Sequence, residues 1–246
     1  MVLPCQAGDR AVHVSLSEIQ TTVCKAAVAV GLPLGLGEDA GRAARWMMAS
    51  GVGSLAAFVD ALDALDKGRS TGFDADRAIA GDFGPKPAGR LLSALRAGPS
   101  ACDLVASAPS TDLGYGRITL TDVDVPIVIL FEALVASADM DKGQCVAWNA
   151  GRGGAIEAVC WRGSLALIKG APEDLLATDS AEITMHLVAR EPRVLAITVD
   201  RRIQRDAVEI DEATWRRVTT YGDRLLVEAT ETSRLTGAGA GVIDTD

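Results

Sequence analysis

The sequence predicts an α+β fold: an N-terminal unit of about three helices, then a mostly antiparallel sheet with one or two packed helices, and an extended Gly-rich C-terminal tail. Two observations carry this prediction. Apolar residues recur at helical spacing as far as Gly68, which is typical of amphipathic helices. After Gly116, short alternating or apolar runs are separated by Gly-containing turns, which indicates strands. Helices followed by strands are typical of the α+β class.

The first helix is predicted to begin after Ser15. The stretch SLSE from Ser15 to Glu18 fits a capping box, in which the first hydroxyl accepts from first-turn amides and the glutamate reaches back to the N-cap amide. Apolar residues follow at helical spacing until Gly31 and Pro33, which end a helix as C-cap and breaker. The helix is therefore expected to end near residue 30.

Two more helices are predicted to follow through short loops. The second opens at GLGEDAG, where Glu38 and Asp39 lie in the first turn and favour the positive end of the helix dipole. Glu38 and Arg42 are spaced so that they can pair on the polar side of this helix. The third helix is expected to begin after Ser54 and to end before Gly68.

The stretch from Lys67 to Pro87 is polar and rich in Gly, Asp and Pro. It is interpreted as a long ordered loop or linker, and a short helix is expected at 89–97. This stretch is the expected boundary between a helical unit over residues 1–68, a linker with the short helix over 69–100, and a mixed sheet unit over 101–246. The three units are expected to form one compact domain.

Strands are expected from Arg117 onward. The alternating segment RITLT at 117–121 predicts a half-buried strand. Residues 125–138 are apolar on all sides and fit either a buried helix or a strand, and their length favours a helix. Three further segments are joined by Gly-rich turns and predict an antiparallel meander. They are residues 144–148, 155–161 and 165–169.

The remaining elements are a hairpin and a last helix. Residues 182–190 and 193–199 flank Glu191-Pro192 and are expected to pair as a hairpin. Asp211 is placed to cap a helix that runs to about residue 228. The Gly-rich tail then ends the chain.

The composition argues against two classes of partner. The 24 Lys and Arg residues against 33 Asp and Glu give a net charge of -9, which repels phosphate backbones, so nucleic acid is not expected. The most apolar run falls short of the roughly 20 residues that span a bilayer, and no signal-like segment opens the chain, so no membrane partner is expected.

The cysteines are odd in number and form no CxxC pair, which indicates reduced thiols in a cytoplasmic protein. The hydrophobic content of 48% suggests a subunit interface, and a homodimer is expected.

The last residues, SRLTGAGAGVIDTD at 233–246, form the most unusual stretch of the chain. A dinucleotide-binding loop precedes a helix, but only five residues follow GAGAG, and the Gly-Lys-Ser/Thr of a Walker A loop is absent. Two interpretations remain: a packed or frayed terminus, or a nest of amides that holds a carboxylate or phosphate beside an arginine. The residues of such a nest are Ser233, Arg234, Gly237, Gly239 and Gly241.

Histidine and cysteine form no recognisable catalytic or metal-binding motif. His13 and His186 are far apart in the sequence and have no HxH or HxxxH neighbourhood. Cys102, Cys145 and Cys160 are more typical of small buried side chains than of nucleophiles. No metal and no cofactor is implied, and no catalytic residue is assigned.

Two stretches resemble the two ends of an uncharacterised proteobacterial protein family, described only as a domain of unknown function. They are SLSEIQTTVCKAAVAVGLPLGLGEDAGRAARWM at the start and ETSRLTGAGAGVIDTD at the end. The segment DVDVPIVIL and the strands around Trp148 and Trp161 fit the same family, so the resemblance spans nearly the whole chain. It implies that the Gly-rich tail is a family feature, and it implies no reaction.

The opening helices are also similar to the N-terminus of the type-2 malate and lactate dehydrogenase family, which binds a nicotinamide cofactor outside the Rossmann fold. That family carries an Asp/Ser-His-Gly motif just after the second helix. This chain has Ala49-Ser50-Gly51 there and no histidine. The hydride-transfer interpretation therefore loses its acid/base residue.

The leading functional hypothesis is an enzyme or binding protein for a small anionic metabolite of the carboxylate type. Its site would bring the Gly-rich tail and Arg234 against Glu38, Asp39 and Arg42, because an arginine with free amides suits a carboxylate. The alternative is a non-catalytic accessory or scaffold protein, in which the tail packs across a partner chain.

Overall fold

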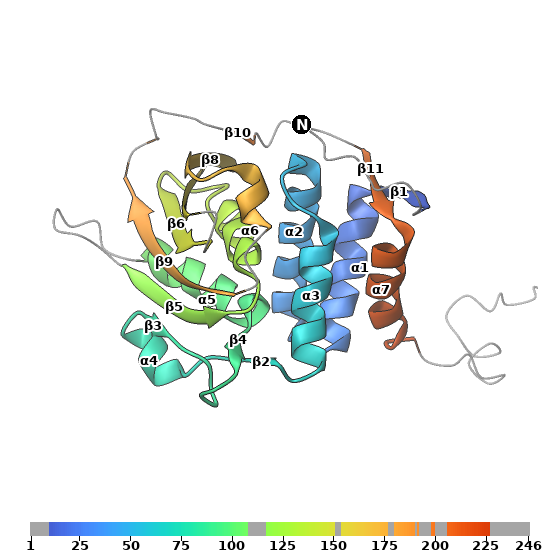
Figure 1. The fold of residues 1–246 in the computed structure, drawn as a ribbon, viewed down its shortest axis with the longest axis horizontal. Coiled ribbons are helices and arrows are strands. Elements are labelled where there is room, and N and C mark those ends of the chain that lie inside the picture. The colour runs from blue at the N-terminus through green and yellow to red at the C-terminus, as the bar shows by residue number, and fades with distance from the viewer. Residues whose placement is uncertain are drawn as a thin grey trace, which may run out of the picture.

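The computed structural model describes residues 10–107, 117–150, 154–176, 180–189, 191, 198–199 and 206–226. The architecture is α+β, as the sequence predicts. Four helices lie side by side on one side of the molecule, and a mixed sheet with two long helices lies next to them (Figure 1). The four are α1 (Leu16–Ala29), α2 (Leu34–Ser50), α3 (Leu55–Asp66) and α7 (Glu212–Asp223). The two that pack with the sheet are α5 (Ala94–Ser107) and α6 (Pro126–Ala136).

Local signals begin α1 and α3 as predicted, but α2 begins at Leu34, so Glu38 and Asp39 do not lie in its first turn as expected. Ser15 accepts a hydrogen bond from the Glu18 N–H at 3.1 Å, and Gly31 with φ of +89° follows the end of α1. Ser54 accepts from the Ala56 N–H at 3.2 Å at the start of α3. The buried side of α2 is narrow and made of small residues, with one methionine. It comprises Gly37, Ala40, Gly41, Ala43, Ala44 and Met47.

A two-stranded antiparallel ribbon joins the two ends of the described chain. Its strands are β1 (Ala11–Ser15) and β11 (Ala207–Asp211). Asp211 accepts from the Thr214 N–H at 2.7 Å and caps α7, as predicted, although α7 ends at Asp223 and is shorter than expected. The ribbon was not expected from the sequence, because half of its residues are exposed and the two strands are far apart along the chain. It places α7 against α1 and α3.

The predicted meander forms the middle of the larger sheet. β6 (Gly143–Asn149), β7 (Ala155–Trp161) and β8 (Ser164–Lys169) pair in antiparallel order. The predicted strand at 117–121 is also confirmed as β5 (Ile118–Val123).

The predicted hairpin between residues 182–190 and 193–199 is wrong. β9 (Ala181–Val188) lies between β5 and β6 and pairs with both. β10 (Thr198–Val199) pairs with β8 instead. Both edges of β9 are therefore occupied by strands that precede it in the chain.

The stretch interpreted as a long loop contains short regular elements. β2 (Ser70–Thr71), β3 (Asp82–Phe83) and β4 (Leu91–Leu92) add parallel pairs beyond β5. Helix α4 (Ala75–Ile79) lies between β2 and β3 in the chain. Two-residue strands have too little periodicity to be recognised from the sequence.

The helix expected at 89–97 begins later and is longer. The Ala94 N–H donates to Asp124 Oδ1 at 2.9 Å at the start of α5. This cap lies 30 positions away in the sequence, so local reasoning could not find it. Pro99 lies inside α5 and interrupts the sequence pattern of the helix.

The apolar segment at 125–138 is a helix, as its length suggested. Pro126 occupies the first turn of α6. Proline is tolerated there because an N–H in the first turn has no hydrogen-bond partner within the helix. All residues from Pro126 to Leu134 are buried, and α2, α5, β6 and β7 surround the helix. Within the described part of the chain, no helix is long and apolar enough to cross a membrane.

Candidate functional site

A cleft of about 630 Å³ lies against α3, and we call it the α3 cleft. Residues next to β2 and β4, the start of α6, and the 3-10 turn η2 (Pro172–Leu175) complete its lining. Most of the lining side chains are Ala, Leu, Val or Ile. The polar ones are Ser54, Asp60, Arg69, Asp124 and Ser180. An apolar cleft with a few polar groups is typical of a small-molecule site.

Arg69 is the one cationic side chain among the described residues that line the cleft. Its main chain is held on both sides: its N–H donates to the Ala64 carbonyl at 2.8 Å, and its carbonyl accepts from the Leu91 N–H at 3.1 Å. Its guanidinium makes no hydrogen bond or ion pair with any described residue. A guanidinium in this position is available to a carboxylate, which it can bind through two parallel hydrogen bonds.

Asp124 is a buried carboxyl group in the lining, only 3% exposed. Its Oδ1 accepts from the N–H groups of Ala94 at 2.9 Å and Val125 at 2.8 Å. Its Oδ2 has no hydrogen-bond partner within the described structure. Burial raises the pKa of Asp124 to about 6, although the two amides and the nearby Ser70 hydroxyl act in the opposite direction. The Ser70 hydroxyl is near enough to act on this pKa but lacks hydrogen-bond geometry to the carboxyl group.

The local sequence explains how Asp124 comes to face inward. The pairing of β5 with β9 is irregular between Leu120 and Val123, and Asp122 there has a φ of +56°. Such an irregularity redirects the strand and is typical of sheet edges and functional sites. The Asp124 N–H donates to the Leu92 carbonyl at 2.9 Å, which holds the turn between β5 and α6 against β4.

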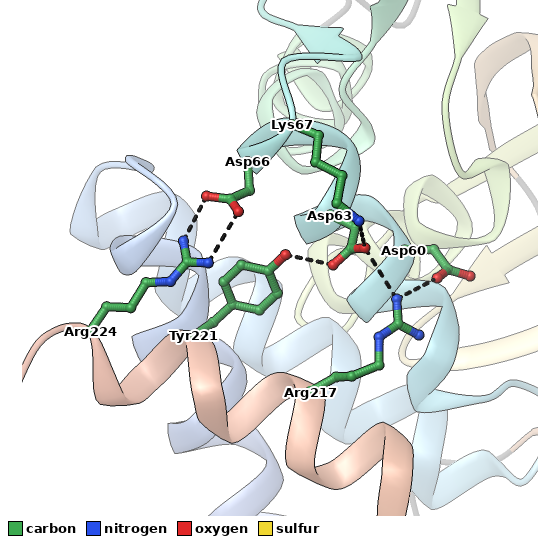
Figure 2. Close-up of polar contacts among 7 residues, drawn as sticks. All are labelled: Asp60, Asp63, Asp66, Lys67, Arg217, Tyr221 and Arg224. Atoms are coloured by element: carbon green, nitrogen blue, oxygen red, sulfur yellow. Dashed lines mark hydrogen bonds and ion pairs between the residues drawn. The ribbon is translucent and has the colours of Figure 1, made fainter.

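Asp60 is the second acidic group of the cleft, and its charge is balanced by α7. Arg217 lies 3.3 Å from Asp60 and also 3.3 Å from Asp63 on the next turn of α3 (Figure 2). With Asp60 paired in this way, Arg69 and Asp124 are the two described charges that the cleft presents without an ionic partner.

The contact between α3 and α7 is a network of polar side chains (Figure 2). The Tyr221 hydroxyl donates to Asp63 at 2.5 Å, and Lys67 also binds this carboxylate. Arg224 binds both oxygens of Asp66 at 2.6 and 3.1 Å, and its guanidinium stacks 4.5 Å from the centre of the Tyr221 ring. Burial alone would raise the pKa of Asp63, but hydrogen bonds from Lys67 and Tyr221 hold it below its ordinary value. The wall of the cleft formed by α3 is thereby fixed to α7.

Of the residues that the sequence selected, three lie on α2. Arg42 pairs with Asp39, three positions away, and Glu38 is exposed. The tail residues of the same hypothesis lie outside the described part of the chain. They are Ser233, Arg234, Gly237, Gly239 and Gly241.

A second buried carboxyl group lies close to the Asp39–Arg42 pair. Glu132 of α6 is 4% exposed, and its Oε1 has no hydrogen-bond partner in the described structure. Burial raises the pKa of Glu132 to about 8; Asp39 adds to this shift and Arg42 opposes it. Gly98 of α5 packs closely against Glu132: a Cβ added at Gly98 would lie 3.1 Å from the Glu132 Cγ. Glu132 is therefore expected to be protonated at neutral pH.

The histidines and cysteines form no reactive site in the described residues. His13 lies 3.4 Å from Glu209 across the exposed ribbon, and burial lowers the pKa of His186 on β9. Cys102 and Cys160 are buried, as expected, and this burial raises the pKa of both thiols, which disfavours the thiolate form. No three potential metal ligands come together within the described ranges.

Sequence reasoning missed Arg69 as a functional candidate because it lies in the stretch interpreted as a loop. It did not select Asp124, which directly precedes the apolar segment at 125–138. A signal was present: an acidic residue directly before a fully buried helix is costly to bury unless other parts of the fold bind it. One of its two amide partners, however, is Ala94 at the start of α5, which was placed wrongly.

Comparisons with known proteins agree with this architecture. Residues 14–89 match a family described as protein of unknown function (DUF3726), which covers α1 to α3 and Arg69 but not Asp124. No curated protein matches the chain. The structure is similar to that of malate dehydrogenase from Pyrococcus horikoshii OT3, with a TM-score of 0.60, 8% sequence identity, and coverage of 94% of this chain and 100% of that chain. The fold is thus shared with that dehydrogenase.

Proposed function

We propose that this chain binds a small carboxylate metabolite in the α3 cleft, with Arg69 as the residue that receives the carboxylate. One observation carries the proposal: Arg69 lines an apolar cleft, and its exposed side chain has no partner among the described residues. Fixed main-chain contacts on both sides of Arg69 limit the positions that the side chain can reach. A positioned guanidinium loses less entropy when it binds a carboxylate.

The charges of the cleft support an anionic ligand. Asp60 is balanced by Arg217, and the raised pKa of Asp124 leaves part of its population neutral near pH 6. Arg69 is then the one cationic group among the described lining residues that an entering carboxylate can meet. Asp124 is also the candidate for proton exchange with the ligand, because raised pKa values are common among catalytic acids and bases.

The structural comparison supports the same class of ligand. The similar protein is a malate dehydrogenase, and malate is a small carboxylate. We extend only the carboxylate to this chain. The position of the dehydrogenase motif holds Ala49, Ser50 and Gly51 here, so the proposal includes no hydride transfer.

The proposal is tested by thermal unfolding with a series of small carboxylates: acetate, propionate, succinate and malate. We expect at least one of them to stabilise the wild-type protein saturably and Arg69→Ala to weaken its binding roughly 10- to 150-fold, the effect of losing a hydrogen bond to a charged group. The matched control is Arg45→Ala, which removes an exposed α2 arginine that donates a hydrogen bond to Gln20 Oε1 at 3.1 Å. Equal stabilisation of Arg69→Ala and wild type would contradict the proposal.

The Gly-rich tail is a second proposed location for the carboxylate. Arg234 with Ser233 and the amides of Gly237, Gly239 and Gly241 would bind it against the opening of α2. Arg234→Ala, or deletion of the residues after Leu235, tests this location in the same assay. Loss of carboxylate stabilisation in these variants, together with full stabilisation in Arg69→Ala, would place the ligand at the tail.

A non-catalytic accessory protein, active as a homodimer, is the second candidate function. The observation that favours it is the pair of exposed leucines directly after α7, Leu225 at 43% and Leu226 at 71% exposure. Exposed apolar side chains of this kind are suited to contact with another chain. The solution mass with and without residues 236–246 tests it, because the accessory role predicts that the shorter protein loses the oligomer.

A further inference from the structure

We propose that the ligand of the α3 cleft is an aminocarboxylate whose ammonium group binds Asp124 while its carboxylate binds Arg69. This inference rests on the proposed function and narrows it to one class of metabolite. Its physical basis is the hydrogen-bonding capacity that Asp124 retains, together with the charge pattern of the cleft.

Asp124 has one satisfied and one unsatisfied oxygen. Its Oδ1 accepts from two backbone N–H groups, whereas its Oδ2 has no partner in the described structure although the residue is only 3% exposed. A buried acceptor without a partner is unfavourable, and a donor-only group satisfies it best. An ammonium group is such a donor, and its positive charge also favours the ionised carboxylate.

The charges of the cleft match a zwitterion. After Asp60 is paired with Arg217, the cleft presents one positive group, Arg69, and one acidic group, Asp124. A plain carboxylate would leave Asp124 without a counter-charge. A hydroxyl group could donate to Asp124 Oδ2 but would bring no charge. An aminocarboxylate provides a charged partner for each group.

The rest of the lining suits an aliphatic body. Ala57 and Ala64 come from α3, Leu91 from β4, and Val125 and Ile127 from the start of α6. Aliphatic walls favour a ligand with a hydrocarbon side chain or spacer between its charged groups. Both α-amino acids and ω-amino acids have this chemistry, and the ligand series below separates them.

The test is calorimetric titration of the full chain with matched ligands. L-Valine is compared with isovalerate, which lacks the amino group, and with 2-hydroxyisovalerate, which has a hydroxyl in its place. The compound 4-aminobutyrate is compared with butyrate. We expect at least one amino ligand to bind wild-type protein roughly tenfold or more tightly than its partners without nitrogen, as for a hydrogen bond between charged groups. Tighter binding of L-valine assigns the α-amino class, and tighter binding of 4-aminobutyrate assigns the ω-amino class.

Asp124→Asn is the variant that identifies the residue. The asparagine keeps an oxygen that can accept hydrogen bonds from the Ala94 and Val125 N–H groups but removes the negative charge. The amino ligand should therefore bind this variant about as tightly as its partners without nitrogen. Asp103→Asn is the matched control, because Asp103 is exposed on the same helix that Asp124 caps, and it should keep the full preference.

Three results would overturn the inference. If isovalerate and butyrate bind as tightly as both amino ligands and need Arg69, the carboxylate function stands and the aminocarboxylate class is wrong. If folded Asp124→Asn retains the preference, Asp124 is not the ammonium-binding residue. If none of the five compounds binds wild-type protein, the aminocarboxylate class and the α3 cleft as a carboxylate site are both contradicted. The wild-type ligand series decides the class even where Asp124→Asn does not fold.

Discussion

Arg217 of α7 lies 3.3 Å from Asp60 of α3, although the two residues are 157 positions apart in the sequence. Asp60 lines the α3 cleft. The same guanidinium lies 3.3 Å from Asp63. Through this contact, the last described helix sets the charge of one wall of the cleft. The contact also predicts that changes on α7 affect ligand binding without touching the ligand.

Arg217→Ala should therefore weaken carboxylate binding and lower stability. Without Arg217, Asp60 presents an unbalanced negative charge to the cleft, and we expect a loss of roughly two- to fivefold in affinity at low salt, the effect of an exposed ion pair. High salt should reduce the loss because it screens the charge. Calorimetric titration at two salt concentrations measures both effects. Arg216→Ala is the control, since Arg216 pairs with Glu212 on its own helix. Tighter carboxylate binding by Arg217→Ala would contradict this electrostatic account.

Tyr221→Phe should loosen α7 from α3. The change removes the hydrogen bond of 2.5 Å to Asp63, and we expect the free energy of unfolding at pH 7 to fall by about 1–2 kcal/mol. The pKa of Asp63 is lowered in the folded protein, so its contribution is present above its ordinary pKa and is lost as the pH falls through the lowered value. The difference between Tyr221→Phe and wild type should therefore shrink as the pH falls below 3.8, the ordinary pKa of an aspartate, and acid protonates Asp63. A difference that stays constant while Asp63 becomes protonated would show that the hydrogen bond to ionised Asp63 is not its source.

Glu132→Gln should change how stability depends on alkaline pH. The pKa of Glu132 is raised from 4.5 to about 8, so the folded protein holds this proton more tightly than the unfolded chain does. Wild-type stability should therefore fall as the pH rises from 4.5 to about 8, by up to about 1.4 kcal/mol per pH unit from this group. Denaturant unfolding from pH 6 to 8 measures the slope, and this window avoids the titration of Asp124 below about pH 6.

The control for this prediction is Glu173→Gln, which changes an exposed glutamate of η2 and should keep the wild-type slope. Glu132→Gln should show a shallower slope whatever its stability at pH 6. An identical slope in Glu132→Gln and wild type would show that Glu132 does not hold a proton in the folded protein.

Two glycines of α2 should respond to alanine in opposite directions. A Cβ at Gly41 would lie 2.5 Å from the Gln20 carbonyl oxygen, so Gly41→Ala must push α2 away from α1. We expect a loss of about 2–4 kcal/mol in the free energy of unfolding, as for a strongly overpacked core position. A Cβ at Gly35 would meet nothing within 4 Å, and Gly35→Ala should be neutral or stabilising by up to about 1 kcal/mol. Equal effects of the two changes would contradict the close approach of α1 and α2.

The sequence predicted the elements that carry their own signals. The Ser15, Ser54 and Asp211 side-chain caps and the meander of β6 to β8 are all confirmed. Each of these depends on residues within a few positions of one another. The fold class follows from them, because a helical start and an antiparallel meander leave few other arrangements.

The parts that sequence reasoning missed depend on contacts between distant segments. Ala94 begins α5 because Asp124 caps it, and β1 forms because β11 lies beside it. The α3 cleft belongs to this group, since Arg69 and Asp124 come from opposite sides of α5 in the chain. The α2 residues were selected for helix-dipole and charge reasons. The dipole reason fails, because α2 begins at Leu34 and has no acidic residue in its first turn, and the charges of Asp39 and Arg42 are satisfied by their own pairing without a ligand.

The central claim is that Arg69 receives a carboxylate in the α3 cleft. A crystal structure with the carboxylate that most stabilises the protein tests it most directly. The account predicts ligand density between α3 and the β2–β4 corner, with carboxylate oxygens within about 3 Å of the Arg69 guanidinium. Ligand density at Arg42 or Arg234, with the α3 cleft containing only water, would contradict it.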